Sequence, residues 1–172
     1  MISLVKGANP NDWVTKITPH PSVTSRFKRF LDILGSMVGL AILAIVFLPI
    51  AIAIKMDSPG PIFFAQERYG LYGNKFRIRK FRSMVSDAEK LKSKVENEAS
   101  GHFFKSQNDF RVTKIGRFLR STSLDELPQF WNVFLGEMSL VGTRPPTSDE
   151  VIHYSEYHWQ RLQVKPGLTG EW

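Results

Sequence analysis

The feature that most constrains this chain is an apolar run of 24 residues, Leu31 to Ile54, in which Asp32 is the only charged side chain. As an α-helix rising about 1.5 Å per residue, the run would measure about 36 Å, which is enough to cross a bilayer with some tilt. Pro49 lies inside the run, where its missing backbone donor bends a helix. The run therefore predicts a membrane helix that is either tilted across the bilayer or bent at Pro49.

Basic residues flank this run on both sides, with Arg26, Lys28 and Arg29 before it and Lys55 after it. Because basic flanks favour the cytoplasmic side, a re-entrant helix that bends and returns would satisfy both ends. Proline is also tolerated in spanning helices, so these residues leave both arrangements open. A helix buried in a soluble core is disfavoured, because so small a chain has little protein with which to cover it.

Composition limits the chemistry that the chain can carry. Its 172 residues suit a single domain. It has no cysteine, which excludes disulfides, zinc-thiolate sites and cysteine nucleophiles. The formal charge of +7 and the pI of about 9.8 favour an anionic partner, which could be nucleic acid, acidic lipid headgroups or a phosphorylated substrate.

The chain divides into three parts. Residues 1–25 are polar, contain three prolines and predict an irregular lead-in. Residues 26–56 form the apolar helix, kinked near Pro49. The turn Ser58-Pro59-Gly60-Pro61 ends this helix abruptly, and residues 57–172 form the third, more polar part.

The third part predicts a small β-hairpin followed by helices. Strands at Ile62–Gln66 and Lys75–Phe81 are joined by a glycine-containing turn, with a bulge near Lys80, where the alternation slips. Helical patterns follow at 83–100, at 112–119, from Leu124 to Met138 and at 148–163. The second of these is basic and amphipathic, which is typical of a helix on an acidic membrane surface but also of an ordinary surface helix. The predicted fold class is α+β, mainly α, with a membrane helix, a small hairpin and amphipathic interfacial helices.

Asp125 and Glu126 are the first candidates for chemistry. Pro128 restricts where the next helix begins, so both carboxylates are expected near a helix N-terminus. Ser123 and Glu126 have the spacing of a capping box, and acidic residues in a first helical turn usually only stabilise the helix. In the alternative interpretation the two carboxylates hold Mg²⁺ beside a diphosphate, and Asp125 is a nucleophile that attacks phosphorus.

Basic side chains are the second set of candidates. Arg and Lys hold phosphate oxygens and stabilise the charge that develops in phosphoryl transfer, whereas a solvated basic face would contain the same residues. Arg144 stands out because Pro145 and Pro146 fix the chain after it. The candidates are Lys80, Arg82, Arg111, Arg117, Arg120 and Arg144. The four histidines have no metal-ligand spacing.

Taken together, these residues resemble a known family, the monotopic phosphoglycosyl transferases of bacteria, from about Arg26 to the end of the chain. No single motif is decisive, but so many motifs in one order are a highly specific signal. They are Lys28-Arg29-Phe30-Leu31-Asp32, Asp57-Ser58-Pro59-Gly60-Pro61, Phe63-Phe64-Ala65-Gln66-Glu67-Arg68, Lys80-Phe81-Arg82-Ser83-Met84, Leu119-Arg120, Leu124-Asp125-Glu126-Leu127-Pro128-Gln129, Met138-Ser139-Leu140-Val141-Gly142 and Lys165-Pro166-Gly167-Leu168-Thr169-Gly170.

The resemblance implies a membrane enzyme. Its helix would be re-entrant and broken at Pro49, with Ser58 and Pro59 at its far end, so that both ends lie on the cytoplasmic face of the bacterial inner membrane. Asp125 would attack the β-phosphate of a UDP-sugar and release UMP, and the phosphosugar would pass to polyprenyl (undecaprenyl) phosphate to initiate glycan or exopolysaccharide assembly. Glu126 and Mg²⁺ would assist. The residues that hold phosphate would be Lys80, Arg82, Arg120 and Arg144.

Two departures from the family pattern stand out. Thr143 replaces the first proline of a Pro-Arg-Pro sequence, which is expected to cost rigidity rather than function. The chain stops at Trp172, where members of the family usually continue. The cytoplasmic catalytic region, residues 57–172, is therefore expected to lack the C-terminal part of the family.

Two other functions fit part of the pattern. A non-catalytic membrane-anchored scaffold that binds acidic lipids would use the apolar helix and the basic face, but it needs no Asp-Glu pair. A nucleic-acid-binding protein would explain the positive charge, and its affinity would fall steeply with salt, but it leaves the apolar run unexplained. We therefore expect a UDP-sugar, polyprenyl phosphate and acidic membrane lipids as partners, and no nucleic acid.

Overall fold

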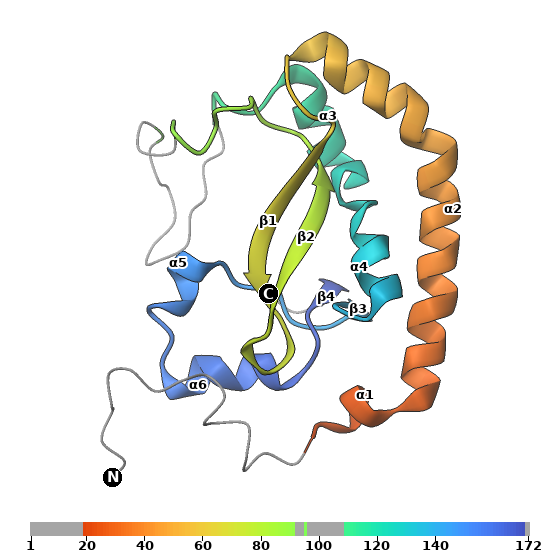
Figure 1. The fold of residues 1–172 in the computed structure, drawn as a ribbon, viewed down its shortest axis with the longest axis vertical. Helices are drawn as coiled ribbons and strands as arrows, with labels where there is room; N and C mark the ends of the chain where they lie inside the picture. The colour runs from red at the N-terminus through yellow and green to blue at the C-terminus, as the bar shows by residue number, and fades with distance from the viewer. Residues whose placement is uncertain (1–18, 92–94, 96–108, 171–172) are drawn as a thin grey trace.

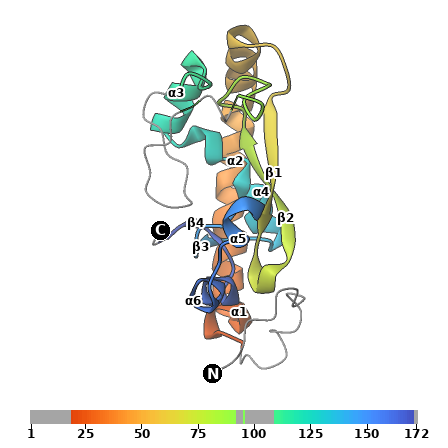
Figure 2. The same ribbon diagram turned by 90° about the vertical axis from the view of Figure 1, so that its left-hand side faces the viewer.

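A computed structural model describes residues 19–91, 95 and 109–170. Its longest element, α2 (Arg26–Asp57), runs along one side of an elongated molecule (Figure 1). Turned by 90°, the molecule is narrow, with α2 behind the other elements (Figure 2). Helix and strand are mixed and helix predominates, as the predicted fold class requires.

α2 begins where the sequence predicts and continues without interruption through Pro49. Ser25 caps its start, and the Ser25 hydroxyl accepts a hydrogen bond from the Lys28 N–H at 3.2 Å. Pro49 removes one backbone donor, yet the chain remains helical on both sides of it. In Figure 1 the C-terminal part of α2 leans over the upper end of the hairpin, so the helix is bent rather than broken.

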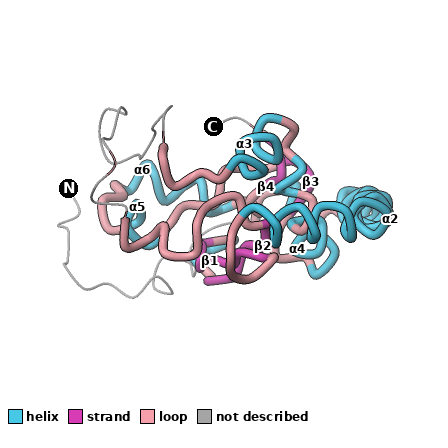
Figure 3. Tube along the Cα trace, turned by 90° about the horizontal axis from the view of Figure 1, so that it is seen from above, coloured by secondary structure: helices cyan, strands magenta, loops and turns pink. Residues whose placement is uncertain are grey.

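The two sides of α2 differ in what covers them. The side that faces the rest of the molecule buries Asp32, Ser36, Gly39, Ile50, Ala51 and Ile54. The other side exposes apolar side chains along the whole helix, from Phe27 at 71% to Ile45 at 79% and Met56 at 83%. Seen from above, α2 stands at the edge of the molecule (Figure 3). Among the described residues it is the one helix long and apolar enough to cross a membrane, judged by length and composition.

β1 (Phe63–Tyr69) and β2 (Lys75–Phe81) pair antiparallel in one unbroken register, so the predicted bulge near Lys80 is wrong. The alternation slips there for another reason. Phe81 lies at the end of the hairpin, where it stacks against Phe47 of α2 with ring centroids 6.3 Å apart. The other buried residues of β2 pack in a separate cluster with residues of α4, on the opposite side of the strand.

The predicted basic amphipathic helix is α3 (Lys114–Ser121), shifted by two residues. One turn of 3₁₀ helix, η4 (Leu124–Glu126), follows it, and α4 (Gln129–Leu135) begins after Pro128. The single helix that the apolar spacing predicts here is therefore divided in two. α4 ends at Gly136, whose φ of 86° is a left-handed conformation that glycine adopts without strain.

Two connections that the sequence does not indicate hold these elements together. β3 (Ser139–Val141) pairs in parallel with β4 (Gly167–Thr169). Asn132 of α4 is fully buried and bonds β2 twice, its Nδ2 donating to the Arg77 carbonyl at 2.8 Å and its Oδ1 accepting from the Arg79 N–H at 3.1 Å. Both connections join segments that are far apart in the sequence.

The helix predicted at 148–163 is wrong as a single element. The segment forms α5 (Ser148–Val151), α6 (Glu156–Trp159) and the 3₁₀ helix η5 (Gln160–Gln163) instead. Thr147 caps the first of these and a second cap begins α6, so the chain restarts a helix rather than continuing one. These short elements lie on the far side of the hairpin from α2 (Figure 1).

Two further predictions concern segments that the structure describes only in part. Of the helix predicted at 83–100, residues 83–91 form a β-bridge and turns rather than a helix, and nearly all of the remainder lies outside the described residues. Of the lead-in, residues 1–18 also lie outside them. Its described end contains a short helix, α1 (Pro21–Thr24), which is capped by the preceding His20, whose ring accepts a hydrogen bond from the Ser22 N–H.

Candidate active site

A cavity of about 620 Å³ opens between the hairpin, the segment from α3 to η4, and the loop after β3. All six residues that the sequence predicts as catalytic or phosphate-holding line it. They are Lys80 of β2, Arg82 just beyond β2, Arg120 of α3, Asp125 and Glu126 of η4, and Arg144 of the loop after β3. The fold therefore gathers side chains that are up to 64 positions apart (80 to 144) around one hollow.

Asp125 is held on the cavity wall by the single turn η4. Ser123, just before this turn, has a φ of 56°, and this left-handed residue separates η4 from α3. The Asp125 residue is only 7% exposed. Burial raises the pKa of its carboxyl group, Lys80 and Arg120 oppose this shift, and the neighbouring Glu126 adds to it. A buried carboxylate with a raised pKa in a basic cavity is a candidate functional group.

Glu126 points to a lysine rather than to the backbone of its own helix. Its Oε1 accepts a hydrogen bond from the Lys80 Nζ at 2.6 Å. The capping box predicted for Ser123 and Glu126 is absent, because the Ser123 side chain makes no capping bond to η4. The predicted capping box is therefore wrong for this turn, although both acidic residues do lie in the first turn of η4. Lys80 instead joins the end of β2 to the acidic pair.

Arg120 and Arg82 have different surroundings although both line the cavity. Arg120 Nε donates to the Ser83 Oγ at 2.9 Å. Arg82 is 5% exposed, and its guanidinium donates to the carbonyls of Ser58, at 2.7 Å, and of Pro59. The structure thus places Arg82 as a group that fixes the chain at the end of α2, with its Nη donors on these two carbonyls and on the Ser86 hydroxyl.

Arg144 is oriented by a carboxylate that the sequence reasoning missed. Its Nη1 donates to both oxygens of Glu150, at 2.8 and 3.0 Å, and Glu150 is itself buried. Arg68, also missed, donates to the Pro145 carbonyl at 3.0 Å and so holds the loop that carries Arg144. The spacing from Thr147 to Glu150 is a capping box, which was the one signal in the sequence that could have drawn attention to Glu150.

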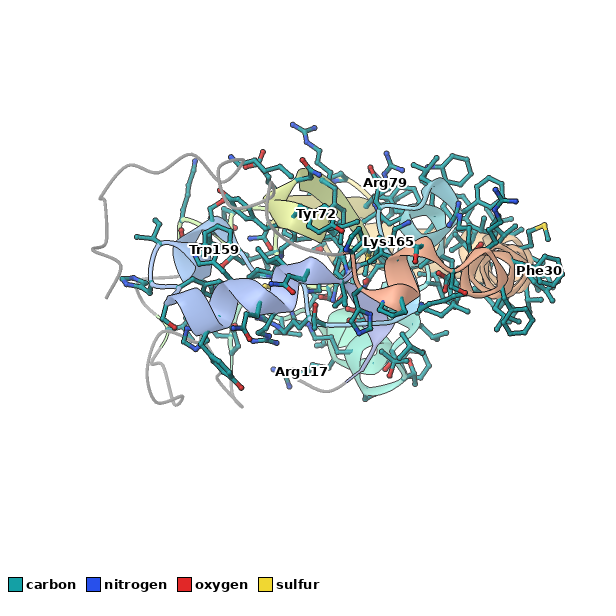
Figure 4. All side chains as sticks on the ribbon, turned by 90° about the horizontal axis from the view of Figure 1, so that it is seen from below. Phe30, Tyr72, Arg79, Arg117, Trp159 and Lys165 are labelled. Carbon is teal, nitrogen blue, oxygen red and sulfur yellow. The ribbon has the colours of Figure 1, made fainter. Side chains whose placement is uncertain are left out.

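The remaining two basic candidates, Arg111 and Arg117, differ in their position relative to the cavity. Arg111 lines the cavity and forms a buried ion pair with Asp109, with Nη2 and Oδ2 2.7 Å apart. Arg117 does not line the cavity, and it projects outward from α3 in the view from below (Figure 4). Arg117 is therefore a surface residue of the amphipathic helix rather than part of this site.

The two adjacent carboxylates of η4 fit a magnesium ion that takes its other ligands from a substrate. Among the described residues no group of three or more His, Cys, Asp or Glu side chains could hold a metal alone. Mg²⁺ commonly takes one or two carboxylates and completes its shell with phosphate oxygens and water. Asp125 and Glu126 suit such shared binding, and they do not suit a metal site made by protein alone.

A buried carboxylate in one cavity with Lys80, Arg120 and Arg144 is the kind of arrangement that suits a phosphorylated substrate. The apolar face of α2 sets this site on a protein with a potential membrane segment. Residues 23–172 match the family described as bacterial sugar transferase, and the chain belongs to that family.

Several bacterial proteins named as sugar or sugar-phosphate transferases are similar to this chain. The galactosyl transferase CpsE of Streptococcus agalactiae is 52% identical over 147 residues, which is 84% of this chain and 32% of that protein. The UDP-glucose:undecaprenyl-phosphate glucose-1-phosphate transferase of Klebsiella pneumoniae is 43% identical over 159 residues, 89% of this chain and 32% of that protein. The undecaprenyl-phosphate galactose phosphotransferase of Salmonella typhimurium is 42% identical over 156 residues, which is 87% of this chain and 33% of that protein. The chain spans about a third of the length of these relatives.

Proposed function

We propose that this chain transfers a phosphosugar from a UDP-sugar to polyprenyl phosphate, and that it does so through a covalent intermediate on Asp125. An oxygen of the Asp125 carboxylate attacks the phosphorus that carries the sugar. The bond from this phosphorus to the bridging oxygen breaks, and UMP leaves with the electron pair. A phosphate oxygen of the polyprenyl phosphate then attacks the same phosphorus, which releases the Asp125 carboxylate and forms polyprenyl diphosphosugar.

The observation that carries this proposal is the environment of Asp125. The carboxylate is buried and lines a basic cavity, so water competes poorly with a substrate for it. Lys80 and Arg120 lie close enough to lower the pKa of Asp125, and their charges suit phosphate oxygens around the reacting phosphorus. The relatives named for sugar-phosphate transfer to undecaprenyl phosphate support the same reaction.

Magnesium is part of the proposal. Asp125 and Glu126 would hold it, and when bound it offsets the negative charge of the diphosphate. Lys80 keeps Glu126 in place through their 2.6 Å contact, and Arg144, oriented by Glu150, holds a phosphate farther along the cavity.

We further propose that α2 is re-entrant and that its exposed face enters the cytoplasmic leaflet of the bacterial inner membrane. Both ends of the helix are fixed to the same body. Near its start Asp32 accepts a hydrogen bond from the Leu140 N–H at 3.0 Å, and at its end Asp57 accepts one from the Ile115 N–H at 2.9 Å. A helix that crossed the bilayer completely would draw one of these polar attachments into the hydrocarbon core, where unpaired polar groups are costly.

The test is UMP release from a panel of UDP-sugars, with polyprenyl phosphate and Mg²⁺, by the native chain and by Asp125→Asn. Native protein should release UMP from at least one sugar, and after incubation without acceptor its mass should rise by one phosphosugar. Both signals should vanish in Asp125→Asn and persist in Glu67→Gln, an exposed acidic residue outside the cavity. Release of UDP, or labelling of Asp125→Asn, would contradict the proposal.

A further inference from the structure

A second cavity, of about 440 Å³, lies beside the N-terminal end of α2. Its walls are the first turns of α2, the strand β3 with the loop after it, and the residues just before β4. It shares no lining residue with the first cavity. The proposed transfer reaction gives it no role.

The charges around this second cavity do not balance. Lys28, Arg29 and Lys165 line it with one acidic residue, Asp32, which leaves two positive charges in excess. Asp32 also has protein partners, because its Oδ1 accepts hydrogen bonds from the Ser139 hydroxyl at 2.9 Å and from a backbone N–H of β3, and its Oδ2 lies 3.6 Å from the Lys28 ammonium. The excess positive charge is therefore not neutralised by the protein groups that line this cavity.

Two of the three cations already have protein partners. Arg29 donates to the carbonyls of Val133 and Phe134, at 2.8 and 2.7 Å, and so caps the end of α4. Lys28 donates to the Ser139 hydroxyl and lies 3.6 Å from Asp32. These two residues therefore contribute positive charge to the cavity, while their hydrogen-bond donors are largely used by protein acceptors.

The third cation, Lys165, differs from Lys28 and Arg29 in its hydrogen-bond partners. It is partly buried, and no hydrogen bond or ion pair of its ammonium group is seen among the described residues. Burial lowers its pKa, and the charges of Arg29 and Lys28 lower it further against the opposing effect of Asp32. In the view from below, Lys165 lies on the inner side of α2 while Phe30 projects from the outer side (Figure 4). A bound anion would give this ammonium group a partner that the described residues do not supply.

We propose that this second cavity binds the phosphate group of an anionic membrane lipid, with the Lys165 ammonium as its main donor. A lysine serves phosphate well as a point charge. The same turns of α2 expose Phe27 at 71% and Phe30 at 60% on their outer side, so the cavity lies next to the face that enters the bilayer. The inference rests on the proposed membrane association of α2 and not on the transfer reaction.

The test is binding in detergent, by titration calorimetry, of dihexanoyl phosphatidylglycerol, dihexanoyl phosphatidylcholine and inorganic phosphate. Phosphatidylglycerol should bind the native chain, and Lys165→Gln should weaken it about tenfold or more, because a charge-assisted hydrogen bond is lost. Lys55→Gln, which removes the same charge from the exposed far end of α2, should weaken it less than twofold. Lys165→Arg should restore binding, which guards against a folding defect in Lys165→Gln.

The arms of this experiment separate the sources of phosphate. Binding of phosphatidylglycerol but not of inorganic phosphate identifies a lipid headgroup site, and equal binding of both identifies a site for free phosphate and overturns the lipid assignment. Equal losses in Lys165→Gln and Lys55→Gln would mean general surface attraction and also overturn it. If Arg120→Gln weakened phosphatidylglycerol binding and Lys165→Gln did not, the binding site would be the first cavity, and the proposal would be overturned. Because no transfer is measured, these results stand whether or not UMP is released.

Discussion

Two buried aspartates, one at the start of α2 and one in η4, have opposite surroundings. Asp32 is 4% exposed and has its donors beside it: the Ser139 hydroxyl, a backbone N–H of β3 and the Lys28 ammonium. Asp125 is 7% exposed, and no side-chain hydrogen bond to its carboxylate is seen in the described part of the chain. Burial is thus almost equal, but among the described residues only the Asp32 carboxylate accepts hydrogen bonds from another element, whereas Asp125 has a hydrogen bond from its own backbone N–H.

The difference teaches how to tell a structural carboxylate from a reactive one. A buried charge that is fully hydrogen-bonded joins two elements and gains little from a ligand. A buried charge in a cavity, with cations near it but not bonded to it, has a raised pKa and remains available to a substrate. Neither exposure nor residue type separates Asp32 from Asp125.

The sharpest test of this comparison is Asp125→Asn. Transfer should fall by about 10³-fold or more, because an amide is a poor nucleophile. Stability should not fall, since the substitution removes a charge whose burial is unfavourable. UMP release and thermal unfolding in detergent measure the two effects. A clear drop in Tm would show that Asp125 is structural after all and would remove the contrast.

The reverse pattern is expected for Asp32→Ala. It leaves two buried donors of β3 without an acceptor, which should cost about 2 to 3 kcal/mol of folding free energy. Asp32→Asn is the matched control and should cost less, because both bonds are accepted by Oδ1, and the amide oxygen of Asn can take its place. Thermal unfolding in detergent measures the difference. A Tm equal to that of the native chain in both variants would contradict the structural role.

The acid limb of the pH–rate profile should follow the pKa of Asp125. The nucleophile must be ionised, so a raised pKa makes the rate fall at a higher pH than an ordinary aspartate would. Glu126→Gln removes a charge that raises this pKa and should shift the limb to lower pH. Lys80→Gln removes one that lowers it and should shift the limb to higher pH. Shifts in the same direction for both variants would argue against this electrostatic picture.

The smallest effect is expected for Lys28→Gln, the matched change beside the structural aspartate. The Lys28 side chain is 29% exposed and 3.6 Å from Asp32, so its loss should cost about 0.5 to 1 kcal/mol. The acid limb of the rate profile should stay in place, because Lys28 is not among the charges that act on Asp125. Thermal unfolding and the pH profile check both points, and a shifted acid limb would couple the two regions.

Much of the site could be predicted from local sequence. The apolar run, the basic helix and the Asp-Glu pair with its following proline are short-range signals, and Lys80, Arg120, Asp125, Glu126 and Arg144 all line one cavity as expected. Predictions that needed a helix to continue failed at Leu127–Pro128, between η4 and α4, and near residue 153, because a 3₁₀ turn before a proline or a new cap interrupts a helix without changing the apolar spacing.

The sequence by itself determined that this chain has one long apolar helix, a basic body and an acidic pair, since these follow from composition and spacing. Only the tertiary structure decided which charges are compensated. It turned Arg82 toward the end of α2, gave Asp32 its donors from β3 and, within the described residues, gave the Lys165 ammonium no acceptor. The physical reason is that hydrogen-bond satisfaction depends on residues brought together from distant parts of the chain. Local sequence spacing does not indicate which of these residues come into contact.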